Sequence, residues 1–211
     1  SNLTAFRISA DNTLIDVNPR NLVLTVTIGG ASGELPFSLA AGAPYTVTAG
    51  SGAAIVPGTA DTGVHAMYFG GTNVALPFAY SFGSQSFTNV FVNGNGILQF
   101  SSQDTFNYYG TIPDAELNNF IAVHWDLLRL DLPGKGIFTS VSGTAPNRIF
   151  NIEWRAVRYF DTNQVINCEA RLFEADARVD LIYGTVDGNG ANASVGNNRP
   201  VDAGAVLDGF Q

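Results

Sequence analysis

Residues 76–82 read LPFAYSF, residues 91–100 read FVNGNGILQF, residues 121–126 read IAVHWD and residues 150–154 read FNIEW. Aromatic and β-branched residues favour strands, and the Gly and Asn residues among them favour tight turns. The chain has one Met and few good helix formers. It is therefore predicted to be all-β, an antiparallel β-sandwich of the jelly-roll or immunoglobulin-like kind.

Residues 147–174 predict a β-hairpin whose strands each have one apolar face. Alternating positions form these faces: Phe150, Ile152, Trp154 and Ala156, then Ile166, Cys168, Ala170 and Leu172. A turn at residues 161–163 keeps the two apolar faces together. The predicted register also sets opposite charges across the ladder, pairing Glu153 with Arg171 and Arg155 with Glu169.

Residues 1–58 are predicted to be a separate N-terminal strand region, followed by the sandwich domain over residues 59–211. A strand is predicted where apolar residues alternate at Leu22, Leu24, Val26 and Ile28. The stretch 49–63, rich in Gly, Ala, Ser, Pro and Thr, marks the boundary. A further short strand is expected at residues 3–9. Because exposed sheet edges invite strand addition, it is the predicted donor to a neighbouring subunit, through Leu3, Phe6 and Ile8.

The chain of 211 residues has a net charge of −8 and a pI near 4.5. Such a surface repels phosphate backbones and offers no basic face to anionic lipids, so nucleic acid is not an expected partner. No apolar run reaches the ~20 residues of a membrane-spanning helix, so no membrane span is expected. An acidic, Lys-poor composition is common in secreted proteins, which predicts an extracellular or cell-surface location. The one cysteine, Cys168, is expected to be buried and unreactive.

Few residues could carry catalysis. His65 and His124 are the only histidines, and with one cysteine they cannot build a Cys/His metal cluster. No Gly-x-Ser-x-Gly motif accompanies them, and His124 is interpreted as a packed or surface residue of a strand. Glu174, Asp176 and Asp180 resemble the paired acids of glycosidases, but their spacing does not place them on one strand face. The chain is therefore predicted not to be an enzyme.

An aromatic loop is the first candidate binding site. Residues 106–110 read FNYYG, and exposed aromatic rings can stack on sugars. Phe106, Tyr108 and Tyr109 are the predicted ligand contacts. The alternative is that these rings fold back over the core.

A second candidate is a calcium loop at residues 187–192, which read DGNGAN. Asp187, Asn189 and Asn192 would supply oxygen ligands at the spacing that calcium loops use. The bidentate Glu that usually closes such a loop is not at its place, so a simple Gly/Asn turn is the alternative. No other cofactor is expected.

Several of these segments resemble the nidogen-type extracellular domain, in the form common in bacterial secreted and surface proteins. The resemblance rests on the order and spacing of residues 76–82, 90–96, 121–126 and 143–154, and spans about residues 62–200. It implies an all-β sandwich, extracellular placement, and a structural or adhesive role without catalysis. Residues 12–56 are also similar to immunoglobulin-like strand modules found beside such domains.

The sequence thus predicts a non-enzymatic extracellular structural protein. We expect it to be the subunit of a cell-surface filament, matrix or surface layer, assembled by β-strand addition. Its expected partners are further copies of itself or other surface proteins. The alternative is a carbohydrate-binding or adhesion module of a secreted protein, with glycans as partners.

Overall fold

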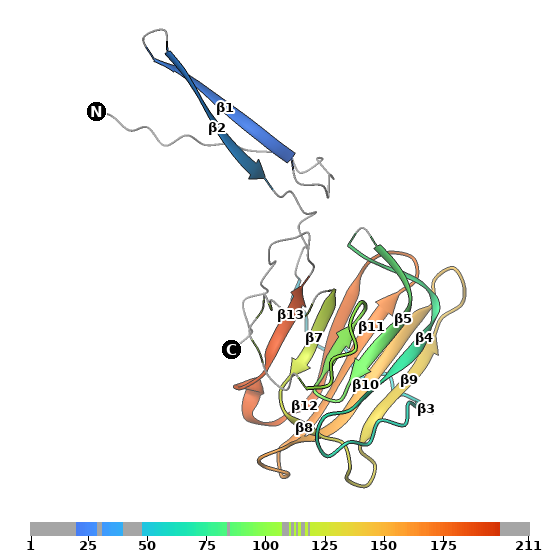
Figure 1. Cartoon of the computed structure of the whole chain (residues 1–211). Coiled ribbons are helices and arrows are strands. Elements are labelled where there is room, and N and C mark those ends of the chain that lie inside the picture. The colour runs from blue at the N-terminus through green and yellow to red at the C-terminus, as the bar shows by residue number, and fades with distance from the viewer. Residues whose placement is uncertain are drawn as a thin grey trace. The chain divides into compact units, whose positions relative to one another are not determined.

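A computed structural model describes residues 48–83, 85–106, 110, 112, 114, 117 and 119–198, and the backbone of residues 20–28 and 31–39 (Figure 1). The chain divides into two compact units, Ser1–Thr46 and Val47–Gln211. The division predicted from composition, between residues 58 and 59, lies later in the chain and stays a prediction.

The first unit contains a β-hairpin. β1 (Arg20–Ile28) and β2 (Ala31–Leu39) form a two-stranded antiparallel sheet, which confirms the strand predicted from the alternating apolar residues. Its register pairs Leu22 with Phe37 and Leu24 with Leu35, so the apolar positions of the two strands coincide. Among the described residues, β1 and β2 pair only with each other.

The second unit is an antiparallel β-sandwich (Figure 1), which confirms the predicted fold class. Its strands are β3 (Ala60–Asp61), β4 (Gly71–Phe82), β5 (Gln85–Asn93), β6 (Ile97–Gln99), β7 (Phe120–Trp125), β8 (Leu128–Arg129), β9 (Gly136–Ser142), β10 (Ile149–Arg158), β11 (Val165–Phe173), β12 (Val179–Val186) and β13 (Ser194–Asn198). One sheet has the order β12-β11-β10-β9-β3, with β8 beside β10, and the other has the order β13-β7-β6-β5-β4. The 3-10 helix η1 (Asp187–Gly190) lies between β12 and β13. No helix in the described part of the chain is long and apolar enough to span a membrane.

The main core lies between the two sheets. All the alternating apolar residues predicted for the hairpin are buried: Phe150, Ile152, Trp154 and Ala156 of β10, and Ile166, Cys168, Ala170 and Leu172 of β11. The indole N–H of Trp154 donates a hydrogen bond to the Asn93 carbonyl at 2.9 Å, so its polar group is satisfied inside the core. Burial raises the pKa of the Cys168 thiol, as expected for an unreactive cysteine.

A buried turn at residues 93–96 joins β5 to β6. Asn93 Oδ1 accepts a hydrogen bond from the Asn95 N–H at 2.7 Å. The carbonyl of Gly96 accepts two hydrogen bonds from backbone N–H groups of β7, at 2.9 and 3.2 Å. Because buried backbone groups need partners, these bonds are what allow a polar turn to sit inside the protein.

β10 and β11 form the predicted hairpin, but the register predicted for their charges is wrong. Glu153 lies directly opposite Glu169, while Arg155 and Arg171 each face an asparagine. The shift from the predicted register is two residues, so every side chain stays on its predicted face. The apolar pattern is the same in both registers and cannot choose between them.

The turn between these strands explains the observed register. Asp161 Oδ1 accepts a hydrogen bond from the Asn163 N–H at 3.1 Å, and the Asp161 carbonyl accepts one from the Gln164 N–H at 3.0 Å. These bonds fix a turn over residues 161–164. The Arg158 N–H also donates to the Gln164 carbonyl at 3.0 Å, which closes a loop over residues 159–163. The hairpin therefore centres on Asp161, one residue before the predicted centre.

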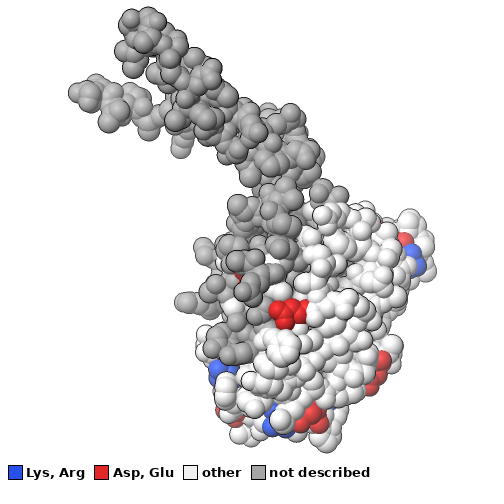
Figure 2. Space-filling model, in the orientation of Figure 1, with Lys and Arg blue, Asp and Glu red and all other residues white. Residues whose placement is uncertain are grey.

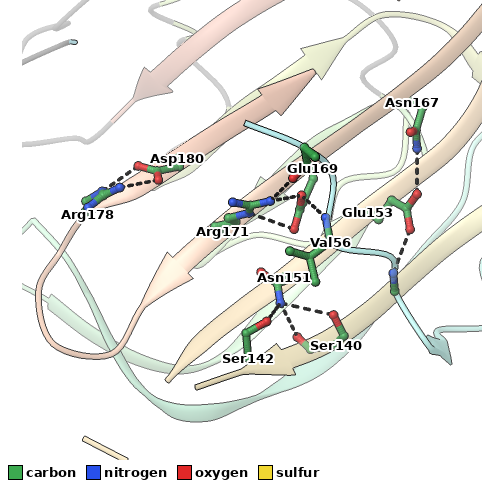
Figure 3. A network of polar contacts seen from close by, with 12 residues as sticks. Val56, Ser140, Ser142, Asn151, Glu153, Asn167, Glu169, Arg171, Arg178 and Asp180 are labelled. Carbon is green, nitrogen blue, oxygen red and sulfur yellow. Dashed lines mark hydrogen bonds and ion pairs between the residues drawn. The ribbon is translucent and has the colours of Figure 1, made fainter. Parts of the chain in front are cut away.

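Two buried glutamates consequently face each other on the side of the six-stranded sheet that points away from the core (Figure 3). Each is neutralised from its own strand. Arg155 Nη2 lies 2.7 Å from Glu153 Oε2, and Arg171 Nη2 lies 3.0 Å from Glu169 Oε2. Like charges that are opposed across a ladder are destabilising unless each has a partner.

Residues 54–58, here called the strap, cover these carboxylates (Figure 3). The Val56 N–H donates to Glu169 at 3.0 Å, and the Gly58 N–H donates to Glu153 at 2.9 Å. Burial opposes ionisation of Glu153, but its hydrogen bonds, from Arg155 first among them, hold its pKa below the ordinary value. The strap then continues into β3 at the edge of this sheet.

Candidate functional site

A polar pocket of about 210 Å³ opens at one end of the sandwich. β7 and β10 end there, β11 begins there, and η1 with its following turn forms one wall. The side chains that matter for its chemistry are those of His124, Asp126, Arg158, Gln164, Asp187 and Asn192.

A β-bulge in β7 directs His124 to this pocket. Between the ladder positions of Trp125 and Ala122, two steps along β13 match three steps along β7. The Gly96 carbonyl accepts both N–H groups at the bulge. The extra residue breaks the alternation, so Trp125 packs with Ala122 in a separate apolar cluster, and His124 lines the pocket. Bulges often re-aim a side chain next to a functional site.

His124 is buried and neutral. Only 2% of its surface is exposed, and burial lowers its pKa to about 4. Within the described part of the chain, its ring takes part in no hydrogen bond. A neutral imidazole has one N–H donor and one N acceptor. The described residues therefore leave both groups of His124 without a hydrogen-bond partner.

We expect His124 to make the protein less stable as the pH falls below about 6.5. The unfolded chain takes up a proton near the ordinary pKa of 6.5, whereas the folded protein does so only near about 4. Between these two pH values the unfolded state binds more protons than the folded state. The free energy of unfolding therefore decreases as the pH is lowered. The expected loss from pH 7 to pH 5 is about 2 kcal/mol.

Urea denaturation at pH 7 and pH 5 measures this loss. The His124→Gln variant is the matched control, because glutamine keeps a donor and an acceptor but does not titrate in this range. Its stability should fall by less between the two pH values. Equal losses in the two proteins would show that other groups cause the acid destabilisation.

Asp126 and Arg158 lie beside His124 as an incompletely bonded ion pair. Asp126 is 7% exposed, and burial raises the pKa of its carboxyl against the opposing effect of Arg158. Arg158 Nε lies 3.3 Å from Asp126 Oδ2. The geometry is not that of a hydrogen bond, and this Nε is buried without a hydrogen-bond partner among the described residues. With its amide oxygen turned to the guanidinium, Asn192 accepts from Arg158 Nη2 at 2.6 Å.

Two of the three predicted calcium ligands line the same pocket. Asp187 Oδ2 accepts a hydrogen bond from the Val165 N–H at 2.7 Å, and Asn192 faces Arg158. The side chain of Asn189 lies outside the described residues. In the portion of the chain that is described, no three His, Cys, Asp or Glu side chains come together to hold a metal ion. Calcium at this loop stays a prediction.

The predicted aromatic loop is described only in part. The Phe106 side chain is 70% exposed, and its ring lies 5.2 Å from the Phe69 ring, measured between centroids. Tyr108 and Tyr109 lie outside the described residues, so sugar binding at this loop stays a prediction. The predicted donor-strand residues also lie outside them: Leu3, Phe6 and Ile8.

Sequence reasoning missed Arg158 and Gln164 altogether, and interpreted His124 only as a packed or surface residue of a strand. The available signal was the His124-Trp125-Asp126 run, in which two titratable residues end an apolar strand. That signal was incomplete, because a bulge depends on the partner strands and leaves the alternation pattern unmarked.

Figure 2 shows one face of the protein. The charged side chains of the described residues lie there in small, separate groups, and uncharged residues cover most of the described surface. The electrostatic field over this face therefore comes from individual charges rather than from one continuous patch.

A family model described as NIDO related matches residues 37–208. The chain belongs to the NIDO-related family. This confirms the resemblance to nidogen-type domains that the strand segments carry. No curated protein and no solved structure matches the chain.

The NIDO-related match includes every strand from β3 to β13, and with them the pocket and the strap. NIDO-related domains are typical of extracellular proteins, and the family is not known as enzymatic. The match begins inside β2, so it also takes in part of the first unit. A bacterial source and an immunoglobulin-like N-terminal segment stay predictions.

Proposed function

We propose that this NIDO-related protein is a non-enzymatic extracellular structural protein, the subunit of a cell-surface filament, matrix or surface layer. Family membership supports an extracellular structural or adhesive module. The proposal that the protein is an assembling subunit rests on one observation. β1 and β2 form a two-stranded sheet in a unit separate from the sandwich.

A hairpin of two nine-residue strands is only marginally stable by itself. Its register brings apolar residues together at matched positions, Leu22 with Phe37 and Leu24 with Leu35. An added strand from a neighbouring subunit would bond an open edge of such a sheet, and the neighbour's apolar side chains would cover its apolar face. This need for a partner supports assembly by β-strand addition.

In this proposal, residues 3–9 are the added strand, contributed to the next subunit through Leu3, Phe6 and Ile8. Alternation places Phe6 and Ile8 on one side of an extended strand, as a donor requires. Assembly would then depend on the first residues of the chain, while the fold of the sandwich would not.

Deletion of residues 1–10 tests this proposal. Negative-stain electron microscopy should show regular fibres or sheets for the full chain and dispersed particles for the truncated chain. Both proteins should unfold at the same temperature. Deletion of residues 202–211 is the matched control and should leave assembly intact. Normal assembly of the chain that lacks residues 1–10 would refute the donor-strand proposal.

A second candidate function is a carbohydrate-binding or adhesion module. It is favoured by the Phe106 side chain, which is 70% exposed in the segment predicted to contact sugars. A glycan array compared with the Tyr108→Ala and Tyr109→Ala variants tests the loop. Glycan binding that is unchanged by both substitutions would show that the aromatic loop is not the binding site.

A further inference from the structure

We propose that the pocket of His124, Asp126 and Arg158 binds a single neutral sugar residue through its hydroxyl groups. This binding site is independent of the proposed assembly, and it lies on different residues from the aromatic loop. Four properties of the pocket support it: polar groups without hydrogen-bond partners among the described residues, charges of both signs, size, and the mixture of donors and acceptors.

The pocket contains polar groups that the described protein leaves unsatisfied. The His124 side chain is largely buried, and its ring takes part in no hydrogen bond with the described residues. Its nitrogens are not among the fully buried atoms, so they keep a little accessible surface. Arg158 Nε is buried beside Asp126 without a hydrogen bond of its own. Because a buried polar group without a partner costs stability, such groups are retained chiefly where something else binds them.

The charges of the pocket disfavour ionic ligands. A metal cation is disfavoured because the Asp126 carboxylate is already ion-paired with the Arg158 guanidinium, and because the described side chains provide no group of three metal-binding residues. The carboxylates of Asp126 and Asp187 outnumber that one guanidinium, so an anionic ligand is disfavoured as well. Neither of these effects disfavours a neutral polar ligand.

The size of the pocket limits the ligand to a small one. About 210 Å³ corresponds to roughly seven water molecules at ~30 Å³ each. Pockets for drug-sized ligands are larger, about 300–1,000 Å³. One sugar ring is a ligand of suitable size, and an oligosaccharide would have to leave its other rings outside.

The functional groups of the pocket match those of a sugar. A hydroxyl group donates one hydrogen bond and accepts others. Asp126 accepts, Arg158 donates, and the neutral His124 ring does both. Neighbouring hydroxyl groups on one ring can therefore bond all three side chains at once, and the backbone bulge holds His124 in place for this.

Ligand-observed NMR on the full chain tests this inference, with glucose, galactose, mannose and N-acetylglucosamine as separate probes at millimolar concentration. At least one sugar should show saturation transfer. Ala191→Trp should abolish the signal, because Ala191 is an exposed residue on the pocket wall and a large ring there fills the opening. Ala175→Trp is the matched control, since Ala175 is exposed in the turn at the other end of β11.

Asp126→Asn keeps the shape of the side chain and should weaken binding by at least tenfold. Saturation transfer that survives Ala191→Trp but is lost in Tyr108→Ala would assign the sugar to the aromatic loop and overturn the inference. It would also be overturned if none of the four sugars bound, or if calcium or zinc chloride alone shifted the His124 ring signals. Fibre assembly, measured on Ala191→Trp, should be unchanged, so failure of this inference is distinguishable from failure of the proposed structural role.

Discussion

Gly96→Ala should lower the free energy of unfolding by roughly 2–5 kcal/mol, or prevent folding altogether. Gly96 has a φ of +80°, a region that residues with a Cβ rarely adopt. A Cβ added there would lie 2.1 Å from the His124 carbonyl oxygen, well inside contact distance. Gly96 and the His124 carbonyl both lie in buried backbone, so neither can move aside without breaking the turn at residues 93–96.

Gly134→Ala separates the two causes of this loss. Gly134 has a similar φ of +75°, but a Cβ added there meets no atom within 4 Å. Its substitution should cost only the backbone penalty of about 1–2 kcal/mol. Urea denaturation of both variants at pH 7 measures the difference. If the free energy of unfolding fell equally in the two variants, the close approach of Gly96 to β7 would contribute nothing to the loss.

The Gly96 substitution should also disturb the pocket. The Gly96 carbonyl holds the two N–H groups of the bulge that directs His124. Moving the turn away from β7 would therefore release His124 from its buried position. In a variant that still folds, the chemical shifts of the His124 ring should titrate nearer the ordinary pKa of 6.5 than in the unaltered protein.

Arg171→Met should lower the free energy of unfolding by roughly 3–5 kcal/mol. Arg171 is the charged partner of Glu169, which has no exposed surface and lies opposite a second glutamate. Arg171 also donates to the Ala54 carbonyl in the strap. Methionine preserves much of the apolar stem, so the loss comes from the charge left buried without its partner and from the missing bond to Ala54, rather than from packing.

Arg178→Met is the matched control. Arg178 pairs with Asp180 in the same two-residue spacing, and both pairs are drawn in Figure 3. The Arg178 side chain is 57% exposed, however, so removing this pair should cost at most about 1 kcal/mol. The double variant Arg171→Met with Glu169→Gln should recover stability relative to Arg171→Met, because the uncompensated charge is gone. Equal losses for the two arginine variants would mean that the buried pair has no special role.

The hairpin of β10 and β11 shows how far sequence reasoning reaches. Its apolar faces were predicted residue by residue, because a strand in a sandwich must alternate between core and surface. Its register was not, because a shift of two residues preserves that alternation. The pairing was decided by a local turn at Asp161 and by the strap, whose N–H groups hold the two carboxylates. No residue pattern in the strap predicts that its N–H groups bind these two carboxylates.

The pocket shows the same limit. Asp187 and Asn192 were singled out by their spacing along the chain, and His124 and Asp126 were visible as polar residues at the end of an apolar strand. Arg158 joins them from the end of β10, far away in the sequence. Their meeting depends on how the ends of strands from both sheets come together, which no local pattern encodes.

The amino-acid sequence by itself determined the all-β class, the residues that face the core, the family resemblance and the acidic character, since each depends on composition or on a short period along the chain. Only the tertiary structure decided which charges oppose each other, where the strap crosses the sheet, and that a bulge turns His124 into a pocket. Those features depend on contacts between distant segments, and their energies compare whole registers and packings rather than single residues.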